Sequence, residues 1–350
     1  MGKYILRRVL AAFPLLFIIS LLVFFGMKLS GADPFAYLAN DPRVRPEEKF
    51  MVRARFGLND PIPLQYVHWL IGDDWYFRDI TGDGVPDEYG RRKGILRGDL
   101  GESIRYRQPV TQVMANFMPN TIILGSTAFV VTVIVSMGIG IFAALRQYSK
   151  ADNAITAVSF IMFSMPIFFI ALLSVQIFSV QFKAWHDDGA TWLPYLPTGG
   201  MYDVRGDRSF DELIRHMILP VFCLAAIQIA GYARYIRATM LEVINSDYIR
   251  TARAKGLAER RVTYLHALKN ASLPIVTLIG LDLPFILAGA VVTETIFSWP
   301  GMGRLYVTSL EPIDPPVVMI FVLMIAVAVV LAQLLVDVVY AWLDPRIRYS

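Results

Sequence analysis

Long apolar segments constrain this sequence more than any other feature, because about 20 mostly apolar residues suffice to cross the hydrocarbon core of a bilayer. The chain is 55% hydrophobic and only 18% charged, whereas typical soluble domains carry about 25% charged residues. These values argue against a soluble enzyme, and the long apolar segments predict an all-α membrane protein. Six segments qualify as spans: Val9–Met27, Thr121–Leu145, Ala154–Phe182, Met217–Ala233, Leu273–Phe297 and Val317–Leu343.

The first apolar segment has two interpretations. Lys3, Arg7 and Arg8 form a basic region before it, and Ser30-Gly31-Ala32 resembles a signal-peptide cleavage site. However, the segment is 19 residues long, which exceeds the apolar core of about 7–15 residues in signal peptides. We therefore expect a retained transmembrane anchor over residues 1–28.

The distribution of Lys and Arg predicts that both termini are cytoplasmic. Short cytoplasmic loops are enriched in these residues. They are frequent in the N-terminus, in the loops after the second and fourth spans, and in the tail, whereas acidic residues dilute them after the third span. The same analysis gives an external region at residues 29–110 and a membrane core at residues 111–350, with a cytoplasmic loop at about 234–273.

The cytoplasmic loop carries signals for two short helices. Ser246 or Asp247 provides an N-cap, and Gly256 provides a stop after Lys255. A second helix is expected at about Glu259–Asn270. From the residues alone, this basic element has two interpretations: a docking surface for a partner, or an amphipathic element lying on anionic lipid.

Four motifs follow one another on the membrane sides that this topology assigns. They are Arg97–Ser103 (RGDLGES), Asp247–Leu257 (DYIRTARAKGL), Thr295–Gly303 (TIFSWPGMG) and Asp344–Tyr349 (DPRIRY). Together they resemble the permeases of ATP-binding-cassette (ABC) importers, and most closely the first, B-type permease of the dipeptide/oligopeptide permease family. The cytoplasmic motif is similar to the EAA loop of these permeases.

The resemblance implies a type I ABC importer permease fold with six transmembrane helices. It also implies that the first cytoplasmic helix is the coupling helix, which docks into a cleft of a separate ATPase subunit. Arg250-Thr251-Ala252 stands where the general motif has Glu-Ala-Ala, so the salt bridge of that glutamate is not expected here. The implied coupling residues are Asp247, Tyr248, Arg250, Thr251, Ala252, Arg253, Ala254, Lys255 and Gly256.

The partners follow from the same resemblance. The sequence contains no G-x-x-x-x-G-K-[ST] loop, so we expect a non-catalytic chain without a cofactor, and ATP and Mg²⁺ in two separate ABC ATPase subunits or domains. The other expected partners are a second homologous permease, a periplasmic or extracellular substrate-binding protein and the lipid bilayer. No basic tract with interleaved aromatic residues indicates nucleic acid. The expected location is a bacterial or archaeal plasma membrane.

The substrate class is left open among several alternatives. The resemblance favours dipeptides or oligopeptides, and related permeases import glutathione or nickel. An ion-coupled secondary carrier that works alone is a second class of function, and a membrane anchor or scaffold is a third. The large basic cytoplasmic loop and the lack of a recognisable internal repeat argue against the carrier.

Polar residues within the apolar segments are candidates for the translocation path. Gln228, Asp282 and Glu294 lie within or at the ends of spans, where carboxylates usually face a bundle interior or a water-filled cavity. Interhelical hydrogen bonding or helix capping explains them equally well. Asp337 is expected to pair with Arg346 or with another chain.

The external region contains one acidic loop with partial metal-ligand spacing. Asp79, Thr81, Asp83 and Asp87 follow the first ligand positions of a calcium loop. Gly90 stands where the bidentate glutamate of such a loop is expected, so a solvated acidic turn is the alternative to a structural Ca²⁺ site. The four histidines showed no pair at zinc-ligand spacing and no H-E-x-x-H motif: His68, His186, His216 and His266.

Overall fold

The computed structural model describes residues 2–31, 43–271, 275, 278, 280, 282, 291–310 and 314–343. Within these ranges the chain is mainly helical, with two short antiparallel hairpins. It divides into two compact units. The core unit comprises Met1–Val9, Met118–Arg304 and Ala328–Ser350, and the loop unit comprises Leu10–Phe117 and Leu305–Val327.

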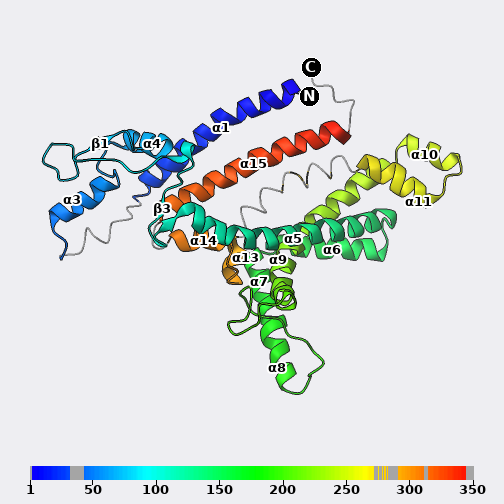
Figure 1. Cartoon of the computed structure of the whole chain (residues 1–350). Helices are drawn as coiled ribbons and strands as arrows, with labels where there is room; N and C mark the ends of the chain where they lie inside the picture. Colours follow the sequence, from blue (N-terminus) through cyan, green and yellow to red (C-terminus); the bar gives the residue numbers. More distant parts are fainter. Residues whose placement is uncertain are drawn as a thin grey trace. The chain divides into compact units, whose positions relative to one another are not determined.

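Five helical segments in the described ranges are long and apolar enough to cross a membrane (Figure 1). They belong to α1 (Gly2–Leu29), α5 (Val110–Leu145), the consecutive segments α7 (Ile167–Ser174), η2 (Val175–Gln181) and α8 (Phe182–Asp187), α9 (Phe210–Ile244) and α15 (Pro315–Leu343). The first, second, fourth and sixth predicted spans fall on such helices. Both α5 and α9 begin well before the apolar segments predicted within them.

The third span differs from the prediction. We expected one continuous segment from Ala154 to Phe182, but α6 (Lys150–Ser164) ends before Pro166 and α7 begins after it. Met165 adopts extended backbone, with φ −85° and ψ 132°. The physical reason is that the proline ring disfavours helical geometry at the preceding residue and that proline has no N–H for the helix ladder. The span-length segment is therefore Ile167–Asp187.

The fifth predicted span, Leu273–Phe297, lies largely outside the described residues. Its described end contains α13 (Val291–Ile296), which a turn connects to α14 (Met302–Leu310). The count of six spans therefore stays a prediction.

The loop unit contains the short elements of the region that the sequence predicts to be external. They are α3 (Pro46–Arg55), α4 (Ile62–Ile71), β1 (Phe77–Arg78), β2 (Glu88–Tyr89), η1 (Ile95–Arg97), β3 (Glu102–Ser103) and β4 (Gln108–Pro109). In the first hairpin Phe77 pairs with Tyr89. A buried cluster of Phe24 from α1, Tyr66 from α4 and Met319 from α15 holds the unit together.

A buried carboxylate connects the second hairpin to the start of α15. Asp314 is fully buried, and its Oδ2 accepts a hydrogen bond of 2.5 Å from the Ser103 hydroxyl. The backbone N–H groups of Ile104 and Arg105 donate to the same carboxylate, each at 3.3 Å. These donors compensate the cost of burying the charge. The β3–β4 turn is thereby fixed to the helix.

In the core unit, a bidentate ion pair joins α6 to α9. The Arg237 guanidinium donates two hydrogen bonds of 2.7 Å to the Asp152 carboxylate, whose side chain is only 1% exposed. These hydrogen bonds, with a further one from the Tyr148 N–H, hold the pKa of Asp152 below its usual value although burial opposes the shift. Asp152 is therefore ionised at neutral pH and stabilises the packing of the two helices.

We expect Asp152→Asn to lower the free energy of unfolding by about 1–3 kcal/mol, because Arg237 loses its charged partner. Thermal unfolding of the purified chain in detergent measures this as a lower Tm. Because the folded pKa is depressed, the stabilisation is present above the unfolded pKa, near 3.8, and is lost as the pH falls through the folded pKa. The Tm difference between wild type and variant should therefore shrink in strong acid.

The matched control for this prediction is Asp188→Asn, at an exposed carboxylate directly after α8. It should leave Tm unchanged. Equal losses in both variants would contradict the role of the Asp152–Arg237 pair, and so would a difference that persists unchanged in acid.

Candidate functional site

The most distinctive candidate site is α10 (Asp247–Ala254), which follows α9 after a turn (Figure 1). Its inner face is buried, with Ile249 completely inaccessible and Ala252 8% exposed. Its outer face is exposed: the Asp247 side chain is 97% exposed and the Arg250 side chain 72% exposed. The helix is thus amphipathic, with a charged surface that is available for a partner.

Local chemistry ends α10 at Ala254, one residue before the predicted end, with Lys255 as the C-cap residue. Gly256 adopts φ +75°, and its N–H donates to the carbonyl of Arg253. The N–H of Leu257 donates to the carbonyl of Ala252, which completes the hydrogen-bond pattern of a Schellman motif. At the other end Ser246 is the N-cap residue, but its hydroxyl donates to the carbonyl of Val243 instead of capping α10.

The buried face of α10 packs on helices of the core unit. Ile249 and Ala252 join one apolar cluster with Ile236 and Met240 of α9. The same cluster includes residues of α5 and of η3 (Val262–Ala267), the segment that follows α11 (Glu259–Arg261). Any displacement of α10 therefore acts directly on α9.

The predicted coupling residues include two ion-paired arginines. The Arg253 Nε lies 2.8 Å from an oxygen of Glu259, across the turn that contains Gly256. Arg250 contacts Asp247 within α10 at 3.5 Å, a weaker pair because both side chains are well exposed. The side chains of Arg253 and Glu259 are also exposed, at 43% and 66%, and Arg250 and Tyr248 add further exposed surface. No structural observation tests the docking role itself, which stays a prediction.

The candidate path residues have different environments. Gln228 is exposed on α9. Asp282 accepts a short hydrogen bond from the hydroxyl of Tyr232, a buried residue of α9. This contact fits the alternative of interhelical pairing, and a role of either residue in the path stays a prediction.

Glu294 is a buried capping residue in this structure. It is 1% exposed, and its Oε1 accepts a hydrogen bond of 2.9 Å from the Thr121 hydroxyl. Its Oε2 accepts from the N–H groups of Gly303, at 2.7 Å, and Arg304, at 3.1 Å, in the first turn of α14. A carboxylate is favourable at a helix N-terminus. The geometry therefore favours capping over exposure to a water-filled path.

Asp337 has a different partner from the expected one. We predicted a pair with Arg346 or with another chain, but the Arg8 Nε lies 2.7 Å from the Asp337 carboxylate. The two residues come from opposite ends of the sequence, and the early position of Arg8 in α1 gave no local signal for this contact. Arg346 lies outside the described residues.

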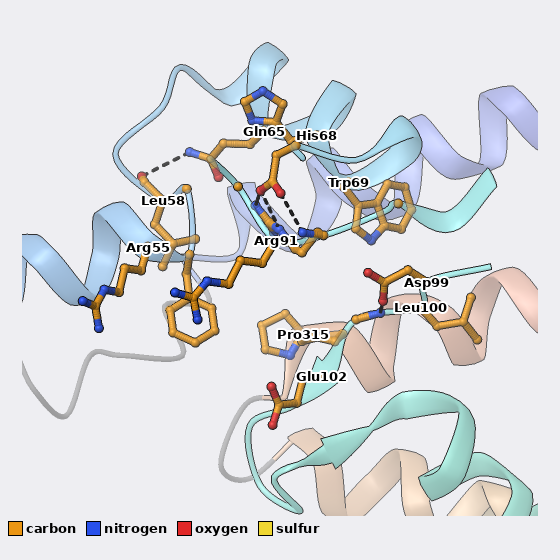
Figure 2. A pocket seen from close by; sticks show the side chains of 18 of the residues that line it. Arg55, Leu58, Gln65, His68, Trp69, Arg91, Asp99, Leu100, Glu102 and Pro315 are labelled. Carbon is orange, nitrogen blue, oxygen red and sulfur yellow. Dashed lines mark hydrogen bonds and ion pairs between the residues drawn. The ribbon is translucent and has the colours of Figure 1, made fainter. Parts of the chain in front are cut away.

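A cavity of about 680 Å³ lies within the loop unit (Figure 2). Trp69 and Leu100 contribute apolar wall, and Arg55, Asp99 and Glu102 contribute charges of both signs. Its volume lies within the range of about 300–1,000 Å³ that is typical of small-molecule sites. The lining thus combines apolar surface with side chains of both charge signs.

A buried charge network forms part of the cavity wall. Asp73 is completely buried and makes ion pairs with Arg78, at 2.9 Å, and Arg92, at 2.8 Å. Burial alone would raise the pKa of Asp73, but the two arginines and the Arg92 N–H outweigh it and lower the pKa. Burial, together with the nearby Arg78 charge, lowers the pKa of His68. At neutral pH Asp73 is therefore charged and His68 is neutral.

In the predicted calcium loop, the carboxylates accept hydrogen bonds from backbone N–H groups. Asp79 accepts from the N–H groups of Gly82, at 2.6 Å, and Gly84, at 2.7 Å. Asp87 accepts from two backbone N–H groups and from the Thr81 hydroxyl, and the backbone bonds lower its pKa. Asp83 accepts from the N–H of Val85. These bonds suit the solvated acidic turn, and the Ca²⁺ site stays a prediction.

One cluster escaped the sequence analysis. Asp203, Glu212 and His216 place ligand-type atoms within 4.8 Å of one another. The cluster contains a single histidine, so it matches neither a histidine pair at zinc-ligand spacing nor an H-E-x-x-H motif. The sequence signal that could have indicated this cluster is the spacing of Glu212 and His216, which at i and i+4 lie on one helix face. Asp203 comes from a loop, and the sequence does not reveal the path of that loop.

Comparisons with known proteins give matches along the length of the chain. Residues 136–349 match the family model described as "Binding-protein-dependent transport system inner membrane component", and residues 1–125 match its N-terminal companion model. The oligopeptide transport system permease protein AppB of Bacillus subtilis is 38% identical over the full length of both chains. The dipeptide transport system permease protein DppB of Escherichia coli K12 is 36% identical, again over the full length of both.

The fold is similar to that of a solved transporter chain. A chain from the inward-facing structure of the MetNI methionine ABC transporter superposes with a TM-score of 0.52. The match covers 67% of this chain and 97% of the other, at 13% identity. This comparison shows the type I importer permease fold for the shared part.

We expect Gly256→Ala to loosen α10, because a side chain at φ +75° costs roughly 1–2 kcal/mol. An added Cβ meets no atom within 4 Å, so backbone strain alone produces the effect. Hydrogen exchange should become faster at the amides of α10, whereas Gly256→Asn should stay closer to wild type, since Asn tolerates this conformation.

The control for this prediction is Gly84→Ala, which also has positive φ and open space but lies in the loop unit. It should leave the exchange of α10 unchanged. Unaltered exchange in Gly256→Ala would show that the Schellman turn does not position α10.

Proposed function

Because the chain belongs to the family of binding-protein-dependent transport system inner membrane components, we propose that it lines the path of an ATP-driven importer for dipeptides or oligopeptides. The chain is a multi-pass inner-membrane permease subunit, and in this family ATP hydrolysis belongs to separate subunits. The peptide substrate rests on the full-length relatives that are named as oligopeptide and dipeptide permeases.

The observation that carries the proposal is the two-faced structure of α10. Its buried residues Ile249 and Ala252 attach it to α9, and its outer face exposes Tyr248 and Arg250. A rigid knob with an exposed, polar and partly aromatic surface suits docking into a cleft of another protein. Lipid binding explains the face less well, because the large apolar residue of α10, Ile249, points into the protein.

The proposed assembly contains this chain, a second homologous permease, two ABC ATPase subunits or domains and a substrate-binding protein on the external side. ATP and Mg²⁺ act in the ATPase subunits. Closure of these subunits would move α10, and the shared apolar cluster would pass that movement to α9 and η3. ATP then shifts the population between two packed states of the spans, because it binds the closed ATPase pair more tightly.

The alternative of an ion-coupled carrier loses support at Glu294, which is one of its two candidate carboxylates beside Asp282. Such a carrier needs an intramembrane carboxylate that exchanges protons or cations. Glu294 instead accepts three hydrogen bonds as the cap of α14 and is 1% exposed. Full-length similarity to transport-system permeases favours the importer as well.

We expect Tyr248→Ala to reduce ATP-dependent uptake of a labelled oligopeptide by about tenfold, a typical size of coupling between sites. The complete importer in proteoliposomes is the system to measure. Tyr248 is 46% exposed on α10, so its truncation removes contact surface without a core cavity. Complexes of wild type and variant should contain equal amounts of this chain.

The control is Tyr264→Ala, because Tyr264 is 58% exposed in η3 of the same cytoplasmic loop. It should retain most of the uptake. Equal uptake in wild type and Tyr248→Ala would disprove docking through α10. Gradient-driven uptake by the purified chain alone, without ATPase subunits, would overturn the importer.

A further inference from the structure

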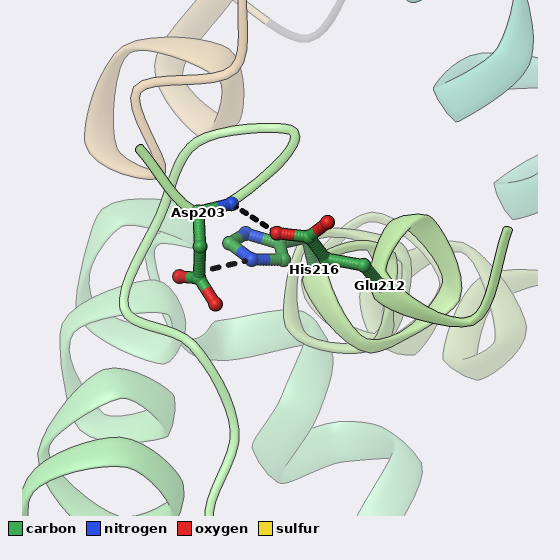
Figure 3. A group of neighbouring side chains, drawn as sticks. All are labelled: Asp203, Glu212 and His216. Carbon is green, nitrogen blue, oxygen red and sulfur yellow. Dashed lines mark hydrogen bonds and ion pairs between the residues drawn. The ribbon is translucent and has the colours of Figure 1, made fainter. Parts of the chain in front are cut away.

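Three side chains that no proposed transport step uses converge at the start of α9 (Figure 3). Glu212 and His216 lie one helical turn apart on α9, and Asp203 comes from the loop that precedes it. One ligand-type atom of each lies within 4.8 Å of the other two. The three differ in burial: His216 is buried, Glu212 is intermediate and Asp203 is exposed.

The imidazole of His216 is held in the orientation of a metal ligand. Its Nδ1 lies 3.1 Å from the carbonyl oxygen of Gly199 and 3.2 Å from that of Gly200. Both atoms are acceptors, so Nδ1 carries the proton and donates. In the neutral ring Nε2 therefore has a free lone pair. A backbone carbonyl on one ring nitrogen is a common way to orient the other toward a metal.

The other ring nitrogen is buried and has no hydrogen-bond partner. His216 is 3% exposed, and its Nε2 makes no hydrogen bond. The nearest carboxylate oxygen is Oδ1 of Asp203, at 3.5 Å (Figure 3). An unsatisfied buried polar atom is costly. A cation between Nε2 and the carboxylates would remove this cost.

The two carboxylates have capacity for a cation. Glu212 accepts the Asp203 N–H, at 2.5 Å, and the Arg208 N–H, at 2.9 Å, on different oxygens. Each oxygen keeps a second lone pair. The Asp203 side chain is 73% exposed and can rotate toward Nε2. Its exposure also leaves room for water in a fourth coordination position.

We propose that Asp203, Glu212 and His216 bind one divalent transition-metal ion of the Zn²⁺ type. An imidazole nitrogen with two carboxylates suits Zn²⁺ better than Ca²⁺ or Mg²⁺, which prefer oxygen ligands. Three protein ligands and one water complete a tetrahedral site. Zn–ligand bonds of about 2.0–2.2 Å require the three ligand atoms, now within 4.8 Å of one another, to move closer together, and the exposed Asp203 side chain is free to do so.

The bound ion would fix to α9 a loop that also contacts the turn after α13. The N–H of Gly200 donates to the carbonyl of Phe297 at 2.7 Å. Met201 of the same loop packs in one apolar cluster with Met217 of α9 and with Trp299. Metal occupancy would therefore stiffen the connection between the start of α9 and the turn after α13.

The test is Zn²⁺ binding to the purified full-length chain, prepared without a histidine tag and stripped with a chelator. Equilibrium dialysis and elemental analysis should give about one bound Zn²⁺ per wild-type chain. Asp203→Asn should abolish this binding or weaken the affinity for Zn²⁺ by at least about tenfold. Asp203 is exposed, so this variant keeps the fold. His216→Gln and Glu212→Gln should behave in the same way.

The matched control is His186→Gln. His186 also has an Nδ1 contact with a backbone carbonyl, that of Leu193 at 3.1 Å, but it does not belong to the three-residue cluster. It should bind Zn²⁺ like the wild type. Co²⁺ in place of Zn²⁺ should give visible absorption bands of a tetrahedral site in wild type and His186→Gln, and not in Asp203→Asn.

Equal Zn²⁺ binding in wild type, Asp203→Asn and His216→Gln would overturn the proposal. So would the absence of Zn²⁺ binding to the wild type, and the cluster would then be a simple contact of His216 with Asp203. The inference does not rest on the peptide importer, since the measurement requires neither ATP nor a transported substrate.

Discussion

The packing of α10 against α9 is the interaction on which the proposed function depends. An isolated helix of eight residues is far below the length of about 12–15 residues at which helices become stable in water. Ile249 and Ala252 supply the missing stability by joining the cluster that contains Ile236 and Met240. The same contact that lets α10 fold therefore also makes it a mechanical extension of α9, and its outer face stays free for a partner.

Within the described residues, several buried carboxylates accept hydrogen bonds that connect elements of the fold. Asp314 fixes a hairpin, Glu294 caps α14 and Asp152 pairs with Arg237. A buried charge is costly unless it is paired or hydrogen-bonded, and each of these groups has several donors. A carboxylate in an apolar segment is therefore weak evidence for a transport path here, because helix termini and turns need the same chemistry.

The sequence predicts features that local physics determines, and it fails where distant residues meet. Span-length apolar segments and the Gly256 stop were predictable because each depends on adjacent residues. A proline in an apolar segment did not by itself show whether the helix ends there. Pro14, Pro119 and Pro220 lie inside helices, whereas α6 ends just before Pro166. The contact of Thr121 with Glu294 joins residues 173 positions apart, and that of Asp203 with His216 depends on a loop path. No spacing rule predicts either of them.

A single helix, α9, connects the proposed metal site to α10. Its 35 residues extend over about 50 Å at 1.5 Å per residue. Glu212 and His216 lie in its first turns, and the helix ends just before α10. Pro220 lies shortly after the histidine, and it removes one hydrogen bond from the helix ladder. A metal ion that fixes the loop before α9 would hold the segment on one side of this proline, while α10 moves the segment on the other. Helices bend preferentially at proline, so a bend at Pro220 would let one segment of α9 move while the other stays fixed.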